Sequence, residues 1–207
     1  MSRTQAEIIY AAGSRYAPTA PLANLDQLLK TQQRFAFVGK PCDIAALRAF
    51  LRLYPHYQQQ IPYLISFMCA GIPSQNATTD VIKAMGADPN NVQSFRYRGD
   101  GWPGMARTVS HSGQIHEMDY NSSWGNILGK QLQHRCKICA DGIGEFADLV
   151  CADAWYGKDG YPDFTERDGR SLVIARTKQG SELLAQAVNN GAINIEPSNL
   201  DEVALMQ

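Results

Sequence analysis

The chain has 207 residues, and its 19 Lys plus Arg nearly balance its 20 Asp plus Glu, giving a net charge of -1. This length can bury a sizeable core, so we expect a single domain, and the near-neutral charge argues against nucleic acid or an anionic membrane as a partner. The N-terminal residues do not resemble a secretory signal, and no run of about 18 apolar residues occurs. We therefore expect a soluble, cytoplasmic protein without membrane insertion.

The first half of the chain has the pattern of a strand, a helix and a second strand. A preceding helix is expected over 21–29, where leucines recur at helical spacing behind Pro21. The apolar segment 35–38 predicts a strand, and a helix should follow it with Asp43 as its N-cap. Residues 63–68 predict the second strand. Such a unit makes its two strands parallel, so the residues that follow them meet at one carboxyl edge of the sheet.

The second half predicts helices and strands in alternation. Helices are expected over 75–85, 124–133 and 181–188, and strands over 92–97, 172–176 and 193–195. Residues 105–110 and 114–120 predict a hairpin, since Ser112-Gly113 lies between them. The fold class is therefore α/β, with a βαβ-containing mixed sheet flanked by helices and an antiparallel hairpin addition.

Cysteines are the residues in this sequence that most strongly indicate chemistry. The chain has 5 of them, an odd number that does not suit a secreted disulfide framework, so metal binding or redox chemistry is favoured. Cys136 and Cys139 form a C-x-x-C pair, which suits a redox dithiol, half of a zinc site or half of a cluster site, or has no such role. Cys151 lies within an apolar run and is interpreted as a small buried side chain.

Two further cysteines complete a set of four. Cys42 follows the first predicted strand and Cys69 follows the second, so both thiols should lie at the same edge of the sheet. Together with Cys136 and Cys139 they could hold a 4Fe-4S cluster, which commonly takes four thiolates. Zinc accepts the same four ligands, so the residues alone leave the metal open.

Several separate motifs occupy residues 37–47, 67–74, 95–104, 135–142, 147–148 and 153–155, in that order. Together they resemble the beta subunit family of coenzyme F420 hydrogenases and dehydrogenases. The resemblance extends from about residue 13 to the end of the chain. Members of the family usually carry more sequence before this point, so we expect the chain to lack an N-terminal segment of the full family.

The resemblance implies an iron-sulfur flavoprotein oxidoreductase with a 4Fe-4S cluster and FAD. Electrons would pass between the cluster, the flavin and an organic hydride acceptor or donor, such as the deazaflavin coenzyme F420. A redox partner protein or subunit is implied as well, and the chain could form an oligomer. The alternative is a non-enzymatic electron-relay or interaction module, in which the four cysteines hold structural zinc or a structural cluster.

Five residues are candidates for contacts with the flavin. Lys40 precedes a helix, where an FAD phosphate would be favoured, although a solvated loop lysine would look the same. Tyr97 and Trp102 could stack on a planar ring beside Arg98, although the neighbouring glycines also suit a turn. Ser123 offers a hydrogen-bonding group or a helix N-cap. No catalytic side chain is assigned, because flavin and cluster supply the chemistry themselves.

Overall fold

The structure is a computed structural model that describes residues 1–158 and 161–206, and the chain divides into two compact units. The first, here called the hairpin unit, comprises Met1–Pro18, Gly71–Lys137 and Phe164–Gly169. The second, the sheet unit, comprises Thr19–Ala70, Ile138–Asp163 and Arg170–Gln207. Each has its own cluster of buried apolar side chains, and the single α/β domain expected from the sequence stays a prediction.

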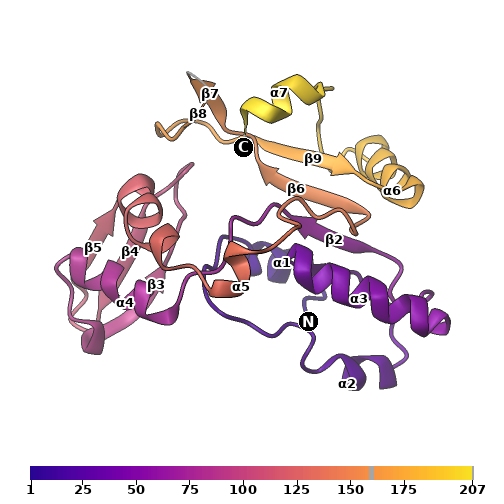
Figure 1. The fold of residues 1–207 in the computed structure, drawn as a ribbon, viewed down its shortest axis with the longest axis horizontal. Coiled ribbons are helices and arrows are strands. Elements are labelled where there is room, and N and C mark those ends of the chain that lie inside the picture. The colour runs from indigo at the N-terminus through magenta and orange to yellow at the C-terminus, as the bar shows by residue number, and fades with distance from the viewer. Residues whose placement is uncertain (159–160, 207) are drawn as a thin grey trace. The chain divides into compact units, whose positions relative to one another are not determined.

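The sheet unit is built on a four-stranded mixed sheet (Figure 1). Its strands, in spatial order, are β1 (Phe37–Gly39), β2 (Leu64–Phe67), β6 (Leu149–Asp153) and β9 (Ser171–Ala175). β1, β2 and β6 run parallel, with Val38 opposite Ile65 and Ile65 opposite Leu149, whereas β9 is antiparallel to β6. The predicted βαβ unit in a mixed sheet is confirmed.

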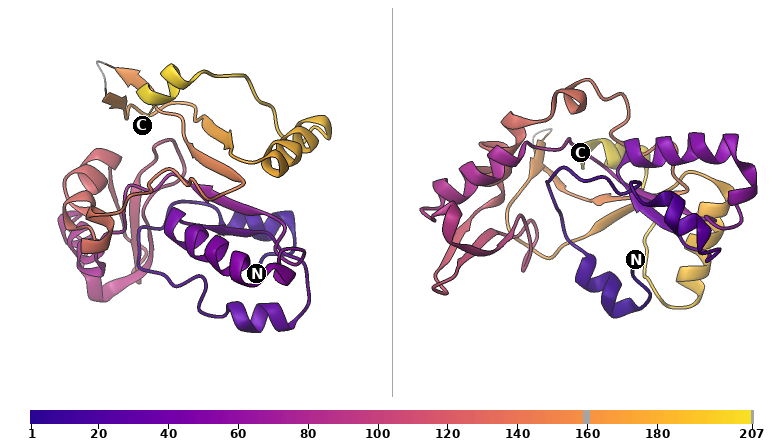
Figure 2. Two further views of the ribbon diagram at one scale, coloured as in Figure 1. Left: turned by 45° about the vertical axis from the view of Figure 1, so that its right-hand side comes forward. Right: turned by 90° about the horizontal axis from the view of Figure 1, so that it is seen from below.

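Helix α3 (Pro41–Leu53) connects β1 to β2 and packs its apolar side against the sheet (Figure 2). Ile44 and Leu47 are fully buried there with Leu64 and Val150. The helix begins before the expected N-cap Asp43: Lys40 is the N-cap, and Pro41 is the first helical residue, where its missing N–H costs nothing. Asp43 instead accepts a hydrogen bond from the Lys40 backbone N–H at 3.3 Å.

Shorter elements complete the sheet unit. They are α2 (Leu25–Lys30), η1 (Pro55–Tyr57), β7 (Tyr156–Lys158), β8 (Tyr161–Asp163), α6 (Lys178–Asn189) and α7 (Leu200–Leu205). The predicted helix over 21–29 is therefore shorter than expected, because residues 21–24 form turns. The strand expected over 193–195 is wrong, since these residues follow α6 without regular secondary structure and pair with no strand in the part of the protein that is described.

The hairpin unit contains a three-stranded antiparallel sheet of β3 (Val92–Arg96), β4 (Ala106–Ser110) and β5 (Ile115–Met118). The predicted hairpin is confirmed as β4 and β5, and β3 extends it. The other elements are α1 (Gln5–Ala11), α4 (Gln75–Ala84), η2 (Pro89–Asn91), η3 (Asn121–Gly125), η4 (Leu128–Gln131) and α5 (His134–Lys137).

The helix predicted over 124–133 is wrong. The segment instead contains the end of the π-helical turn η3 and the single 3-10 turn η4. Gly125 and Gly129 lower its helix propensity, and a Cβ at Gly125 would lie 2.7 Å from Asn121 Oδ1. Ile127 and Trp124 still pack against the buried Leu128, Val81 and Ala77, so tertiary contacts hold this irregular segment in place. Among the described residues, no helix combines the length and apolar character needed to cross a membrane.

Candidate functional site

Cys42 and Cys69 lie at the carboxyl ends of neighbouring parallel strands. Cys42 is the second residue of α3, which starts directly behind β1, and Cys69 comes just after the end of β2. The order of the elements alone produces this placement, because a βαβ crossover returns the chain to the same edge. The sequence anticipated this shared edge, while the role of the two thiols as ligands stays a prediction.

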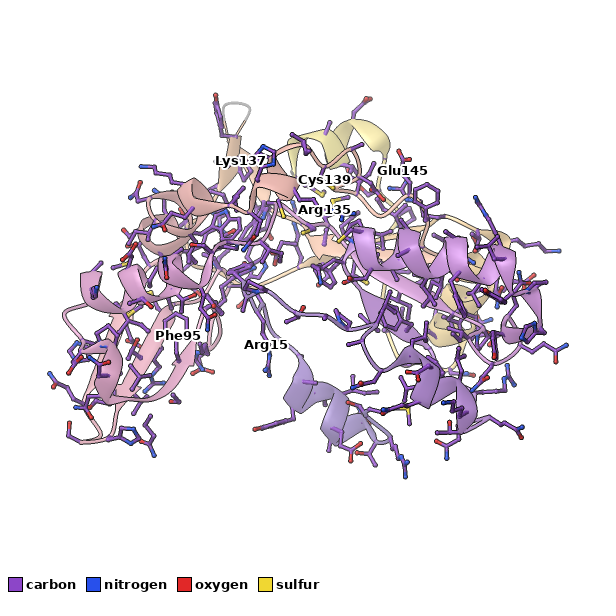
Figure 3. The ribbon with its side chains drawn as sticks, turned by 60° about the horizontal axis from the view of Figure 1, so that its bottom comes forward. Arg15, Phe95, Arg135, Lys137, Cys139 and Glu145 are labelled. Atoms are coloured by element: carbon purple, nitrogen blue, oxygen red, sulfur yellow. The ribbon has the colours of Figure 1, made fainter. Side chains whose placement is uncertain are left out.

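Cys139 lies on a loop of the sheet unit that is bonded to the Cys69 segment. The Cys69 backbone N–H donates to Gly142 O at 2.8 Å, and the Cys139 thiol donates to Asp141 O at 3.4 Å. Figure 3 labels Cys139 and Glu145 near the two ends of this loop. Cys69 and Cys139 are therefore both hydrogen-bonded to the short segment formed by Asp141 and Gly142.

The Cys42 thiol lies in surroundings that disfavour its anion. Although part of the residue is exposed, burial of the thiol is the largest cause that raises its pKa, and the Asp43 carboxylate raises it further. Lys40 opposes this shift, whereas Cys139 adds to it. A bound iron or zinc ion would reverse the effect, since coordination favours the thiolate.

Cys136 is held within the hairpin unit, three residues before Cys139. It lies in the single turn of α5, and its Sγ accepts a hydrogen bond from the Ile72 backbone N–H at 3.4 Å. Gly71 allows this approach: its φ is +108°, and a Cβ there would lie 3.2 Å from Cys136 Cβ. Backbone N–H groups directed at cysteine sulfur are a recurring feature of iron-sulfur sites, because they stabilise negative charge on the sulfur.

The described residues contain no assembled metal site. Within the described part of the chain, no group of three or more His, Cys, Asp or Glu side chains is arranged to hold a metal ion, and no cysteine there forms a disulfide. The donor set nevertheless suits a cluster chemically, since it consists of four thiols, and the sulfur of Cys136 already accepts a backbone N–H. The four-cysteine ligand set stays a prediction.

Cys151 differs from its predicted environment. It lies in β6 as expected, opposite Phe67 and Val173, but its side chain is exposed rather than buried. Successive strand residues point to opposite faces, and α3 covers the face that contains Val150, so Cys151 points to the other face. The interpretation of Cys151 as a small buried side chain is therefore wrong.

Lys40 is already engaged by neighbouring side chains. Its Nζ lies 2.6 Å from Asp43 Oδ2 and donates to Thr19 Oγ1 at 3.3 Å, and only 12% of its side chain is exposed. The interpretation as a solvated loop lysine is therefore wrong. A phosphate at the start of α3 would have to share Lys40 with Asp43.

The segment around Arg98 and Trp102 forms a tight loop. Arg98 Nε donates to Pro103 O at 2.7 Å, its guanidinium lies 5.0 Å from the Tyr120 ring centroid, and the Trp102 backbone N–H donates to Glu166. Gly104 has φ +75°, and a Cβ there would lie 2.8 Å from Gly99 O. The glycines are therefore required by the conformation of the turn, and their presence does not by itself indicate a binding site.

Tyr97 and Ser123 are both engaged in packing of the hairpin unit. The Tyr97 hydroxyl lies 2.7 Å from Thr78 Oγ1, and its ring contacts Tyr16 and Phe95 edge-on, with centroid distances of 5.4 and 4.8 Å. Ser123 is 1% exposed and donates to Asp119 O at 2.9 Å from inside η3, so the interpretation as a helix N-cap is wrong. Their contact with a flavin stays a prediction.

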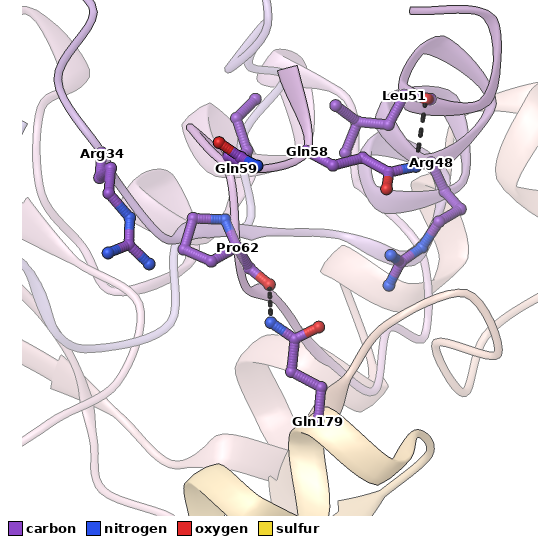
Figure 4. A pocket seen from close by; sticks show the side chains of 8 residues that line it. Arg34, Arg48, Leu51, Gln58, Gln59, Pro62 and Gln179 are labelled. Carbon is purple, nitrogen blue, oxygen red and sulfur yellow. Dashed lines mark hydrogen bonds between the residues drawn. The ribbon is translucent and has the colours of Figure 1, made fainter. Parts of the chain in front are cut away.

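A pocket that the sequence did not indicate lies at the amino end of β1 and β2 (Figure 4). Its lining consists of Arg34, Arg48, Leu51, Gln58, Gln59, Ile61, Pro62 and Gln179. Gln179 Nε2 donates to Pro62 O at 2.7 Å, and Arg48 Nη2 donates to the buried Asp148 carboxylate at 3.0 Å. This pocket is at the opposite end of these strands from Cys42 and Cys69.

Comparison with known proteins gives a consistent family. The family model that describes the C terminus of the coenzyme F420 hydrogenase/dehydrogenase beta subunit matches residues 32–200. The coenzyme F420 hydrogenase subunit beta of Methanothermobacter thermautotrophicus is 24% identical over 205 residues, which are 95% of this chain and 65% of that protein. The subunit of the same name from Methanosarcina barkeri is 23% identical over 95% of this chain and 63% of its own length.

Two further similarities extend this comparison. The coenzyme F420-dependent sulfite reductase of Methanocaldococcus jannaschii is 25% identical over 92% of this chain and 29% of its own length. A chain in the xenon-derivatised F420-reducing [NiFe] hydrogenase complex from Methanosarcina barkeri has the same fold, with a TM-score of 0.66 and 20% identity over 98% of this chain and 67% of that one. The chain spans less than two thirds of the length of these curated relatives.

Proposed function

Because the chain belongs to the coenzyme F420 hydrogenase/dehydrogenase beta subunit family, we propose that it is an iron-sulfur flavoprotein oxidoreductase module. In this proposal Cys42, Cys69, Cys136 and Cys139 hold one 4Fe-4S cluster, and FAD binds the same chain. The two groups together convert single electrons into a hydride that is exchanged with an organic molecule such as coenzyme F420.

One observation carries the cluster assignment. Two candidate ligands follow adjacent parallel strands, and the backbone of one of them is hydrogen-bonded to the loop of a third, at 2.8 Å between Cys69 N and Gly142 O. Ligands of open α/β sheets characteristically bind outside the carboxyl ends of the strands, which is where Cys42 and Cys69 lie. The fourth, Cys136, is three residues from Cys139 in the chain.

Lys40 and Arg98 are the proposed anion contacts of the flavin, each in its own unit. Lys40 precedes the first turn of α3, where backbone N–H groups lack partners within the helix and favour a phosphate. Arg98 lies beside the aromatic ring of Tyr120, in surroundings suited to a planar ligand. Tyr97, Trp102 and Ser123 are proposed to shape this region through the packing described above.

The names of the relatives suggest the partners. The curated relatives are described as coenzyme F420 hydrogenase subunits and as a coenzyme F420-dependent sulfite reductase, and the solved structure is a hydrogenase complex. We therefore propose a deazaflavin as the hydride acceptor or donor, a redox partner subunit that exchanges electrons with the cluster, and a cytoplasmic location.

Metal and flavin analysis of the anaerobically purified protein tests the proposal. We expect about four iron and four sulfide per chain, with bound FAD and little zinc, as a cubane cluster requires. Reduced coenzyme F420 should then bleach the flavin absorbance. Stoichiometric zinc without flavin would contradict the proposal and would favour the alternative, a non-enzymatic module with a structural four-cysteine site.

A further inference from the structure

We infer that the loop from Asp141 to Glu145 is a preformed scaffold for the cluster and that Asp141 is its positioning residue. This inference rests on the proposed function, because it concerns how the chain holds Cys139 and Cys69 as ligands. Asp141 itself is not one of the ligands. Its carboxylate is occupied by the backbone of the loop that follows it.

The Asp141 carboxylate accepts hydrogen bonds from three consecutive backbone N–H groups. Its Oδ1 accepts from Ile143 at 3.0 Å, from Gly144 at 2.7 Å and from Glu145 at 3.3 Å, and Oδ2 also accepts from Glu145, at 3.2 Å. Hydrogen bonds to an ionised carboxylate are roughly twice as strong as those between neutral groups. One side chain therefore fixes the conformation of the whole loop.

The same loop is bonded to both neighbouring cysteine segments of the sheet unit. Gly142 O accepts from the Cys69 N–H at 2.8 Å, and Asp141 O accepts from the Cys139 thiol at 3.4 Å. Gly142 passes close to the Cys69 backbone, since a Cβ on it would lie 3.2 Å from Cys69 O. The positions of Cys69 and Cys139 are thus set by the backbone of two adjacent residues.

The far end of the loop is anchored on the strand ends that precede Cys42 and Cys69. Gly144 has φ +69°, and a Cβ on it would lie 3.0 Å from both Ser66 Cβ and Val150 Cγ2. Ser66 Oγ in turn donates to Gly39 O at 3.0 Å, and this hydrogen bond joins the carboxyl ends of β2 and β1. The loop that follows Cys139 is therefore packed against β2, which is hydrogen-bonded to the end of β1 through Ser66.

Apolar packing contributes little to the order of this loop. The side chains of Ile143 and Phe146 are 44% and 39% exposed, and Cys139 and Glu145 are exposed as well. The loop is ordered instead by the Asp141 hydrogen bonds and by Arg176 Nη2, which donates to Ile143 O at 2.9 Å. Loss of the carboxylate should therefore displace Cys139 rather than unfold the sheet.

The test compares Asp141→Ala, Asp141→Asn and Glu145→Ala with the wild-type protein, each purified anaerobically with its cluster. Residues that orient metal ligands typically change metal affinity by about 10- to 100-fold, so Asp141→Ala should lose iron to a chelator faster by about that factor. Asn accepts the same N–H groups without the charge and should fall between alanine and wild type. Glu145→Ala, on the same loop, should match the wild type.

The electron paramagnetic resonance spectrum of the reduced cluster distinguishes positioning from general stability. Displacement of Cys139 should change the spectrum of the cluster that remains in Asp141→Ala, whereas Glu145→Ala should keep the wild-type spectrum. A wild-type protein without iron would defeat the proposed function. If the wild-type protein has a cluster and Asp141→Ala matches it in resistance to the chelator and in spectrum, the role of Asp141 is overturned while the proposed function stands. If the alanine variant does not fold, wild-type behaviour of Asp141→Asn overturns it.

Discussion

Cys136 and Cys151 provide the sharpest comparison between single residues, because only the first accepts a backbone N–H at its sulfur. Cys136→Ser should remove most of the bound iron, since an un-ionised hydroxyl does not replace a thiolate ligand. Cys151→Ser should keep its iron near the wild-type value, because an exposed strand thiol tolerates a hydroxyl. Iron and sulfide per chain after identical anaerobic purification measure both effects, and equal loss in the two variants would contradict the ligand set.

Gly71 tests how closely the backbone must approach Cys136. Gly71→Ala should destabilise the protein by about 1–3 kcal/mol through its positive φ, and should also lower iron content by pushing on Cys136 and Leu132. Gly86→Ala is the matched control, since its φ is +80° but a Cβ there meets no atom within 4 Å. It should lose stability while keeping its iron. Urea unfolding and iron analysis separate the two effects, and iron loss in both variants would refute the steric explanation.

Lys40 and Arg98 test the flavin contacts. Lys40→Ala and Arg98→Ala should each weaken FAD retention by about 1–3 kcal/mol, the scale of a charge-assisted hydrogen bond, while leaving iron content intact. Lys30→Ala serves as the control, because Lys30 pairs with Asp26 on the exposed surface of α2. The measurement is the amount of FAD that stays bound per chain as each purified protein is diluted. Full flavin and full activity in both variants would make these residues ordinary structural cations.

At the scale of elements, one buried carboxylate connects four of them. Asp148, just before β6, accepts from Arg48 of α3, from Leu64 N of β2 at 2.8 Å and from Thr177, the N-cap of α6, at 2.9 Å. Asp148→Ala should therefore destabilise the sheet unit by about 1–3 kcal/mol, the usual cost of leaving a buried donor such as the Leu64 N–H without its acceptor. Asp26→Ala, which breaks an exposed pair, should cost at most about 1 kcal/mol. A small effect of Asp148→Ala in urea unfolding would show that the carboxylate is dispensable.

Local patterns predicted those elements whose sequence and surroundings agree. β2 and α4 lie within a residue or two of their expected bounds because each combines a periodic apolar pattern with clear end signals, such as the Ser74 cap. The segment 124–133 failed because its glycines oppose a helix while its apolar side chains are held by tertiary contacts. The exposure of Cys151 could not be read from its apolar neighbours, since which face of β6 is covered depends on the whole sheet.

The candidate site was predictable in part for the same reason. The shared edge of Cys42 and Cys69 follows from strand order, which the βαβ pattern determines. The function of Asp141 could not be inferred, because its partners are backbone N–H groups whose directions depend on the folded loop. The local signal of such a turn is an aspartate two residues after the C-x-x-C pair, followed by Gly142 and Gly144.

At the scale of the whole molecule, the two units are not continuous in sequence. In the sequence, Gly71–Lys137 of the hairpin unit comes after β2 and before β6 of the sheet unit. The sequence alone showed no linker or change of composition at either end of this segment. The ligand segments around Cys69 and Cys139 lie at the two places where the chain passes from one unit to the other, so removing iron should loosen both connections. We expect the protein after chelation to be cut by protease faster near residues 69–72 and 136–145 than the protein with its cluster. Unchanged cleavage there would argue against ligands on both segments.

The hydrogen bond between Cys69 and Gly142 has a topological consequence. It joins the two ends of an insertion, so residues 70–141 form a closed loop that leaves the sheet and returns to the same point. A cluster bound by Cys69 and Cys139 would close that loop with strong bonds, which on the chain-entropy scale used for disulfides is worth about 4 kcal/mol. Since this value grows only with the logarithm of loop length, the insertion can lengthen or shorten at little cost while its closure, and with it the ligand edge, stays the same.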